Sequence, residues 1–171
     1  MTRWGVLLPT FDPHRTGGAL PTLEAARLAE AAGFDAVWAG DHLACPAPVL
    51  DAPTCLAAAA AVTERVELGI AVLQLGLRQP AWAAKQLATL DALSGGRLAL
   101  GVGVGGEFPE EFAAAGVTHR DRGARLDELL GVLPDLLTGR PVRHSGPALQ
   151  LDVPALEPAM PAPPRLLVGG R

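Results

Sequence analysis

The feature of this sequence that most constrains its fold is a regular alternation of short apolar runs with longer runs rich in alanine and leucine. A short run bounded by Gly or Pro predicts a buried strand, and a long run with apolar residues three and four apart predicts a helix. This order predicts an α/β fold with a parallel sheet, because strand–helix–strand units join parallel neighbours by right-handed crossovers. The expected strands cover residues 4–9, 34–40, 66–72, 97–104 and 165–168, and the expected helices cover residues 21–32, 51–63, 80–94 and 126–137.

Length and composition indicate a single domain. The chain has 171 residues, of which 49% are apolar and 19% are charged, which is enough to bury one core. We therefore expect one domain over residues 1–171, with an irregular, Pro-rich connection at 140–164 before the fifth strand. Pro134 lies inside the last expected helix and predicts a kink or an early end there.

Charge and cysteine content argue against several classes of function. A net charge of -4 gives no electrostatic basis for binding nucleic acid or an anionic membrane, and the apolar runs are too short to span a bilayer. A proline interrupts the apolar run near the N-terminus, so no signal peptide is expected. Cys45 and Cys55 are too few for a disulfide framework, and His14, His119 and His144 lack metal-binding spacing. We expect a cytoplasmic protein with reduced thiols and no metal.

The topology predicts where a ligand would bind. In parallel α/β sheets, ligands bind at the carboxyl ends of the strands. The loops that follow the expected strands cover residues 10–19, 41–50, 73–79 and 105–109. We expect these four loops to form one rim, and we expect the site to lie there.

A run of glycines follows the fourth expected strand. Gly101, Gly103 and Gly106 match the spacing of a dinucleotide-binding fingerprint, but that motif belongs after a first strand and needs an acidic residue about 20 positions later at a strand end. The acidic residues at that distance, Asp121 and Asp127, fall at the start of or inside an expected helix. Two interpretations stay open: the glycines leave room for a flat ligand or another backbone segment, or they relieve crowding inside a small barrel.

Three polar residues at the rim are candidates for proton transfer. Asp41 and His42 directly follow the second expected strand, and a histidine beside a carboxylate can donate or accept a proton near neutral pH. The alternative is that Asp41 hydrogen-bonds the loop backbone and His42 is merely half exposed. Glu107 follows the glycines. The alternative interpretation of this residue is a solvated loop acid beside Glu110 and Glu111, with no role in proton transfer.

Six segments together carry a resemblance to a known family. They are AEAAGFDAVWAGDH at 29–42, LGIAV at 68–72, KQLATLD at 85–91, SGGRLALGVGVGGE at 94–107, RGARLDE at 122–128 and PRLLVGG at 164–170. In this order they resemble the luciferase-like flavin monooxygenase family over essentially the whole chain.

The resemblance implies a TIM-type (β/α) barrel that binds FMN or the deazaflavin coenzyme F420 and oxidises or reduces a small organic substrate. It implies catalytic roles for Asp41 and His42, with His42 near the cofactor and substrate, and a second acid–base role for Glu107. The residues implied to bind the cofactor are Gly69, Ile70, Ala71, Gly101, Gly103, Gly105, Gly169 and Gly170.

Two departures from the family pattern limit what the resemblance implies. Some relatives have a Trp a few residues after the histidine, but residues 43–46 are Leu-Ala-Cys-Pro. A complete barrel also needs eight strand–helix units and about 250 residues, whereas this sequence reaches a fifth strand. The alternative function is therefore a truncated, non-catalytic remnant that binds flavin weakly or acts in association.

The resemblance also implies a homodimer. Family members usually dimerise through the second and third helices, which here are the expected helices at 51–63 and 80–94. Five consecutive alanines, Ala57 to Ala61, give the first of these a bare surface that another helix can approach closely. A flavodoxin-type sheet is a further alternative, but residues 10–18 contain no convincing phosphate-binding loop.

Overall fold

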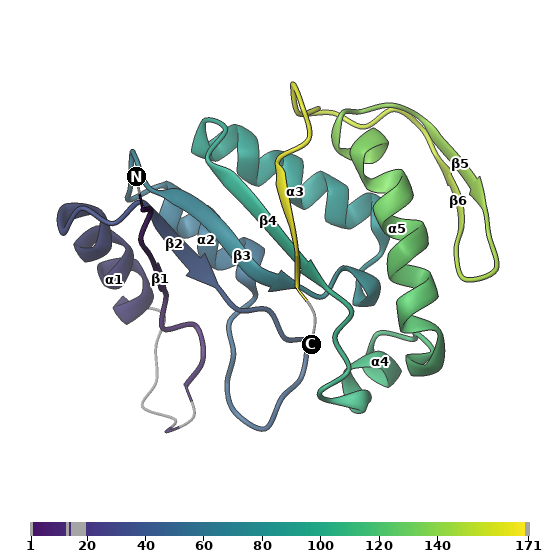
Figure 1. Cartoon of the computed structure of the whole chain (residues 1–171), viewed down its shortest axis with the longest axis horizontal. Coiled ribbons are helices and arrows are strands. Elements are labelled where there is room, and N and C mark those ends of the chain that lie inside the picture. The colour runs from purple at the N-terminus through teal and green to yellow at the C-terminus, as the bar shows by residue number, and fades with distance from the viewer. Residues whose placement is uncertain (1, 13, 15–19, 170–171) are drawn as a thin grey trace.

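The computed structural model describes residues 2–12, 14 and 20–169 of the chain, without the side chain of Leu20 (Figure 1). Gly170, one of the expected cofactor-binding residues, and most of the 10–19 loop lie outside these described residues. Among the described helices, none combines the length and the apolar character needed to cross a bilayer. The cytoplasmic location stays a prediction.

Five parallel strands form the central sheet. They are β1 (Gly5–Leu7), β2 (Ala36–Ala39), β3 (Glu67–Leu73), β4 (Leu98–Gly103) and β7 (Arg165–Gly169), in the order β1-β2-β3-β4-β7. Every neighbouring pair is parallel, with Val6 opposite Val37 and Leu68 opposite Leu98 among the partners. The predicted α/β class and parallel topology are confirmed, and the strands are the first five of an incomplete (β/α) barrel.

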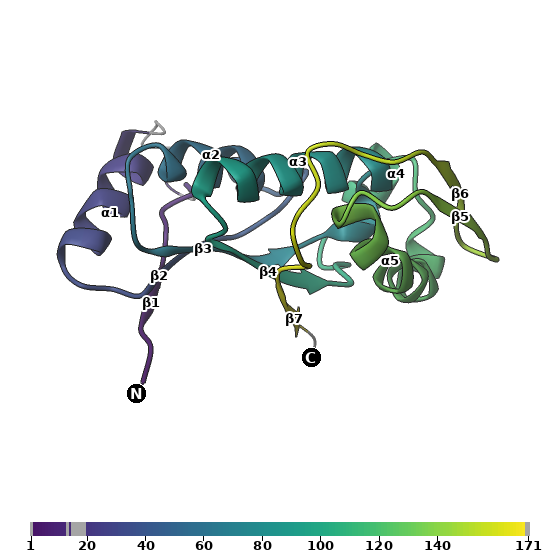
Figure 2. The same ribbon diagram turned by 90° about the horizontal axis from the view of Figure 1, so that it is seen from above.

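The long helices lie on one side of this sheet. The helices α1 (Leu20–Ala31), α2 (Ala52–Ala60) and α3 (Pro80–Ser94) form a layer over it, and α5 (Arg122–Leu137) continues that layer beyond β4 (Figure 2). The core lies between the two layers, where Leu68 and Leu100 of the central strands are fully buried. In the described part of the chain, no helix covers the opposite side of the sheet (Figure 2).

Local sequence signals explain where the central helices begin and end. The Asp51 side chain caps α2 by accepting a hydrogen bond from the Thr54 backbone N–H at 3.0 Å, and Pro53 occupies the first turn. α3 ends at Gly95, whose φ of 70° lies in the left-handed region that glycine adopts without a steric penalty.

α5 continues through Pro134 to Leu137, so the prediction of an early end at this proline is wrong, and the kink stays a prediction. Only one turn of helix follows the proline. Leu133, Leu136 and Leu137 in this region are buried against the core, and their packing offsets the hydrogen bond that proline cannot donate.

The 140–164 segment, expected to be irregular, contains an antiparallel hairpin of β5 (Val142–Ser145) and β6 (Gln150–Val153). The tip of the hairpin is attached to α5, because Glu128 accepts a hydrogen bond from the Ala148 N–H at 3.0 Å and Arg125 donates one to the Ala148 carbonyl at 3.3 Å. The start of α5 therefore holds the hairpin in place.

Candidate functional site

A cavity of about 600 Å³ lies at the carboxyl ends of β2, β3, β4 and β7, where the parallel topology predicted a site. Segments far apart in the sequence meet around it. Its lining residues are Gly40, Asp41, His42, Ala71, Val72, Gln74, Gly103, Val104, Gly105, Gly106, Glu107 and Gly169.

The floor of the cavity is a side chain seated on glycines. The register between β3 and β4 shifts after Ile70, and the peptide bond between Ala71 and Val72 is cis. A Cβ on Gly103 would lie 2.5 Å from Val72 Cγ2, and one on Gly169 would lie 2.9 Å from Val72 Cγ1. These glycines therefore make room for the Val72 side chain, which fits the second interpretation of the glycine run, relief of crowding inside the barrel.

Seven of the expected site residues line this cavity: Asp41, His42, Ala71, Gly103, Gly105, Glu107 and Gly169. Three others lie elsewhere. Gly69 lies beneath the indole ring of Trp38, which a Cβ at this position would strike, and Ile70 is fully buried in the core. Gly101 lies against the Ile70 carbonyl oxygen and Val72.

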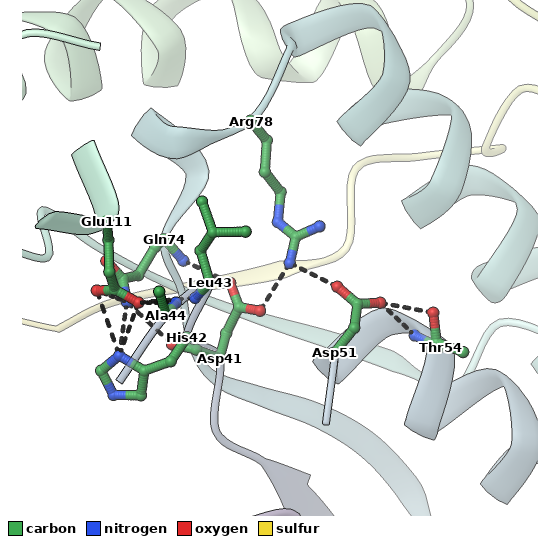
Figure 3. Close-up of polar contacts among 9 residues, drawn as sticks. All are labelled: Asp41, His42, Leu43, Ala44, Asp51, Thr54, Gln74, Arg78 and Glu111. Atoms are coloured by element: carbon green, nitrogen blue, oxygen red, sulfur yellow. Dashed lines mark hydrogen bonds and ion pairs between the residues drawn. The ribbon is translucent and has the colours of Figure 1, made fainter. Parts of the chain in front are cut away.

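Asp41 is a buried carboxylate that joins the site to α2 (Figure 3). One of its oxygens accepts a hydrogen bond from the Gln74 backbone N–H at 3.0 Å, and the other accepts one from the Arg78 guanidinium at 2.6 Å. The same guanidinium nitrogen donates to Asp51 at 2.9 Å. No hydrogen bond joins the Asp41 carboxylate to the His42 ring. The expected direct pairing of these two side chains is therefore not present.

The charges in this chain of contacts stabilise one another. Burial alone would lower the pKa of Arg78, but Asp41 and Asp51 raise it above its ordinary value. Burial alone would raise the pKa of Asp51, but hydrogen bonds from Thr54 and Arg78 hold it below its ordinary value. Arg78 and Asp51 are therefore both ionised at neutral pH.

The group that contacts the His42 ring is Glu111. The Nδ1 atom of His42 lies 3.2 Å from Glu111 Oε1 and 3.0 Å from Gln74 Nε2 (Figure 3). The Phe108 ring also contacts the His42 imidazole, edge-on, with the ring centroids 5.3 Å apart. Both Phe108 and Glu111 belong to the start of α4 (Pro109–Ala114), so this short helix orients the histidine.

Glu111 is fully buried and is held as a carboxylate by several donors. The Leu43 N–H at 2.7 Å, the Ala44 N–H at 3.0 Å and the Gln74 amide at 3.1 Å all donate to it. Burial alone would raise the pKa of Glu111, but these hydrogen bonds and the one with His42 hold it below its ordinary value.

Glu111, Gln74 and Arg78 are site residues that sequence reasoning missed. Glu111 was expected only as a solvated acid next to Glu107, because α4 was not predicted. A signal for α4 was present, since Pro109 at the first helical position is followed by two acidic residues in the first turn. Nothing in the local sequence marks Gln74 or Arg78, whose partners are 27 to 37 positions away.

Within residues 2–12, 14 and 20–169, no group of three or more His, Cys, Asp and Glu side chains is placed to hold a metal ion. The polar side chains of the cavity instead lie beside a floor formed by Val72 and glycines. A parallel (β/α) part-barrel with a cavity at the carboxyl ends of its strands is the arrangement in which barrel enzymes place their active sites.

The family model for luciferase-like monooxygenases matches residues 2–171, and the chain belongs to this family, as the resemblance predicted. Among solved structures, it is similar to the monooxygenase RslO1 from Streptomyces bottropensis, with 30% identity and a TM-score of 0.83 over 98% of this chain and 53% of that chain. It is also similar to an F420-dependent secondary alcohol dehydrogenase, solved with an F420–acetone adduct, with 26% identity and a TM-score of 0.83 over 99% of this chain and 52% of that chain.

The fold is shared as well with the oxygenating constituent of 3,6-diketocamphane monooxygenase from Pseudomonas putida, solved with FMN. The identity is 21% and the TM-score 0.78, over 89% of this chain and 44% of that chain. Solved relatives thus bind F420 or FMN, the two cofactors that the sequence predicted. The chain spans 57% of the length of the first curated relatives that it matches, at 33% identity.

Proposed function

We propose that this chain carries the cofactor-facing half of a flavin- or deazaflavin-dependent oxidoreductase that acts on a small organic substrate. The observation that carries the proposal is the cavity at the strand ends, with His42 and Glu107 beside a glycine-rich floor. F420 and FMN, with which similar structures have been solved, are the two candidate cofactors.

The residues present fit a flat ring system. Gly103, Gly105, Gly106 and Gly169 line the cavity of about 600 Å³ without side chains, so a planar ring can approach the backbone there. Residues 71–72, 103–105 and 169 would hold the ring by contact. When bound, the cofactor would supply hydride or oxygen chemistry that no protein side chain can perform.

Each polar residue then has a distinct part. His42 would hold or accept the substrate proton at the ring nitrogen that faces away from Glu111, and Glu107 is a second acid–base candidate at the cavity edge. Asp41 fixes the loop that carries His42 through its hydrogen bonds to Gln74 and Arg78, and it takes no part in moving the proton.

Binding and turnover test the proposal separately. Titration of the purified chain with FMN and with F420, followed by fluorescence, is expected to show saturable binding of one of them. No binding at high micromolar ligand would instead favour the non-catalytic remnant. In a preparation that turns over, His42→Ala should lower the rate by about a hundredfold or more while ligand binding and folding persist.

We also propose that the chain forms a homodimer through α2 and α3. A shallow groove of about 370 Å³ runs between these helices, lined by Pro53, Thr54, Ala57, Trp82, Lys85, Gln86, Thr89, Leu90 and Leu93. Trp82 and Leu93 are 70% and 66% exposed there, and large exposed apolar side chains around a groove are typical of a protein–protein contact.

A further inference from the structure

We infer that Glu111 is a positioning residue that keeps neutral His42 in the Nδ1–H tautomer, so that the unprotonated nitrogen Nε2 is the one available to a ligand. The use of Nε2 as a proton acceptor in catalysis rests on the proposed function. The tautomer itself does not, because it follows from contacts within the chain.

The first step is the charge state of Glu111. Its side chain is fully buried, yet its Oε1 atom accepts hydrogen bonds from two consecutive backbone N–H groups, those of Leu43 and Ala44. A protonated carboxylic acid could not use these donors as well as a carboxylate does, because hydrogen bonds to an ionised acceptor are roughly twice as strong. Glu111 is therefore an anion that faces Nδ1 of His42.

The second step is the number of hydrogens on Gln74. Its amide nitrogen has two, and it lies 3.1 Å from both the Asp41 carbonyl oxygen and Glu111 Oε2. Two acceptor oxygens on this side fix the amide orientation, and they use both hydrogens. No Gln74 hydrogen is then left for His42 Nδ1, although the two nitrogens are 3.0 Å apart.

The two steps decide which ring nitrogen carries the proton. If Nδ1 lacked a hydrogen, its lone pair would face the Glu111 carboxylate at 3.2 Å and a Gln74 nitrogen with no hydrogen to offer. With a hydrogen, Nδ1 donates a charge-assisted hydrogen bond to Glu111. The edge-on contact with Phe108 helps to hold the ring in this orientation.

The consequence is a histidine with one free nitrogen. Nε2 lies on the side of the ring away from Glu111 (Figure 3), and it forms no hydrogen bond with any described residue. In free histidine the Nε2–H tautomer predominates, and that form would present a donor to the ligand. Glu111 reverses this preference, so that neutral His42 presents an acceptor.

Nitrogen NMR of the full chain without cofactor tests the inference. The protein is labelled with ¹⁵N-histidine and observed in alkaline buffer, where histidine rings are neutral. The expected spectrum for His42 has a pyrrole-type shift at Nδ1 and a pyridine-type shift at Nε2. A His42 signal with the two shifts exchanged would overturn the inference, and this measurement requires no variant to fold.

Two matched variants test whether Glu111 is the cause. Glu111→Gln replaces the anion by a neutral amide and should lower the ratio of Nδ1–H to Nε2–H by about tenfold. Glu110→Gln removes the same charge from an exposed neighbour on the same helix and should leave the ratio unchanged. An unchanged ratio in Glu111→Gln would overturn the positioning role. If the ratios behave as expected but neither FMN nor F420 binds, the inference stands and the proposed function fails.

Discussion

At the scale of single residues, the site depends on carboxylates that are buried and hydrogen-bonded. Asp41 and Glu111 are 6% and 0% exposed, and each is surrounded by N–H donors from other segments. A buried charge is tolerated only when such donors replace the water that it loses. The stability of this region is therefore tied to pH and to the completeness of these hydrogen bonds.

Glu111 makes a prediction about acid stability. Its pKa in the folded chain lies below the ordinary value of 4.5, so its stabilising contribution is fully present above about pH 4.5 and is lost as the pH falls through the folded pKa. Glu111→Gln places an NH2 group against the Gln74 amide and should lower the free energy of unfolding at pH 7 by about 1–3 kcal/mol. Urea unfolding between about pH 3 and 7 should show the wild type and the variant converging at the acid end. A gap that widens as the pH falls would contradict this sign, and Glu110→Gln serves as the control.

Gly103 makes a prediction about the cavity floor. An added methyl group would lie 2.5 Å from Val72 Cγ2, so Val72 must move toward the cavity. Gly103→Ala should therefore lower the free energy of unfolding by about 1–3 kcal/mol and weaken binding of the cofactor by about tenfold or more.

The matched control for Gly103 is Gly131, a helical glycine of α5 with nothing within 4 Å of the added carbon. Gly131→Ala should raise the free energy of unfolding by about 0.5–1 kcal/mol. Thermal unfolding and fluorescence titration of the two variants separate packing at the floor from the general effect of replacing a glycine. Equal effects of the two substitutions would contradict the prediction that the Val72 side chain needs the space left by Gly103.

At the scale of elements, Asp51 connects the start of α2 to the site. It caps the helix through Thr54 and accepts a hydrogen bond from Arg78, which in turn holds Asp41. Asp51→Ala should lower the free energy of unfolding by about 0.5–2 kcal/mol, the usual range for a lost N-cap. The control is Asp152→Ala, which removes an exposed ion pair with Arg143 and should change the free energy by less than about 0.5 kcal/mol. Urea unfolding of both variants at pH 7 compares the two.

Elements with strong local signals were predictable from the sequence. The bounds of α3 agree with the prediction at both ends, because Pro80 and Gly95 mark its first turn and its end. α4 was missed because its six residues are too few for a helical period to emerge. The hairpin was missed because its stability comes from contacts with α5 that no local pattern contains.

The residues of the candidate site also fall into two groups, those predictable from the sequence and those that were not. Asp41, His42 and Glu107 were predictable, because each follows a strand and the topology brings strand ends together. The partners of His42 were not, since Glu111 lies 69 positions away and its burial depends on the helix that was missed. Tertiary contact, and not sequence proximity, pairs the histidine with its carboxylate.

At the scale of the whole molecule, the half-barrel has surfaces of two different kinds. One is the groove between α2 and α3 on the helical side, and the other is the helix-free side of the sheet with its edge strands β1 and β7. Large apolar side chains are exposed at both, with Trp82 on α3 and Trp4 just before β1. The proposed dimer uses the groove, and variants at the two surfaces distinguish it from association through the open side of the sheet.

Two tryptophans give matched variants for this comparison, because Trp82 and Trp4 are 70% and 67% exposed and neither belongs to the core. If the proposed dimer uses α2 and α3, Trp82→Asp should shift the chain from dimer to monomer in sedimentation velocity, because a charge buried in an interface is costly. Trp4→Asp should leave the dimer intact, and both variants should retain the helical circular dichroism of the wild type. Dissociation by Trp4→Asp alone would place the contact at the open side of the sheet instead, and a monomeric wild type would exclude the dimer altogether.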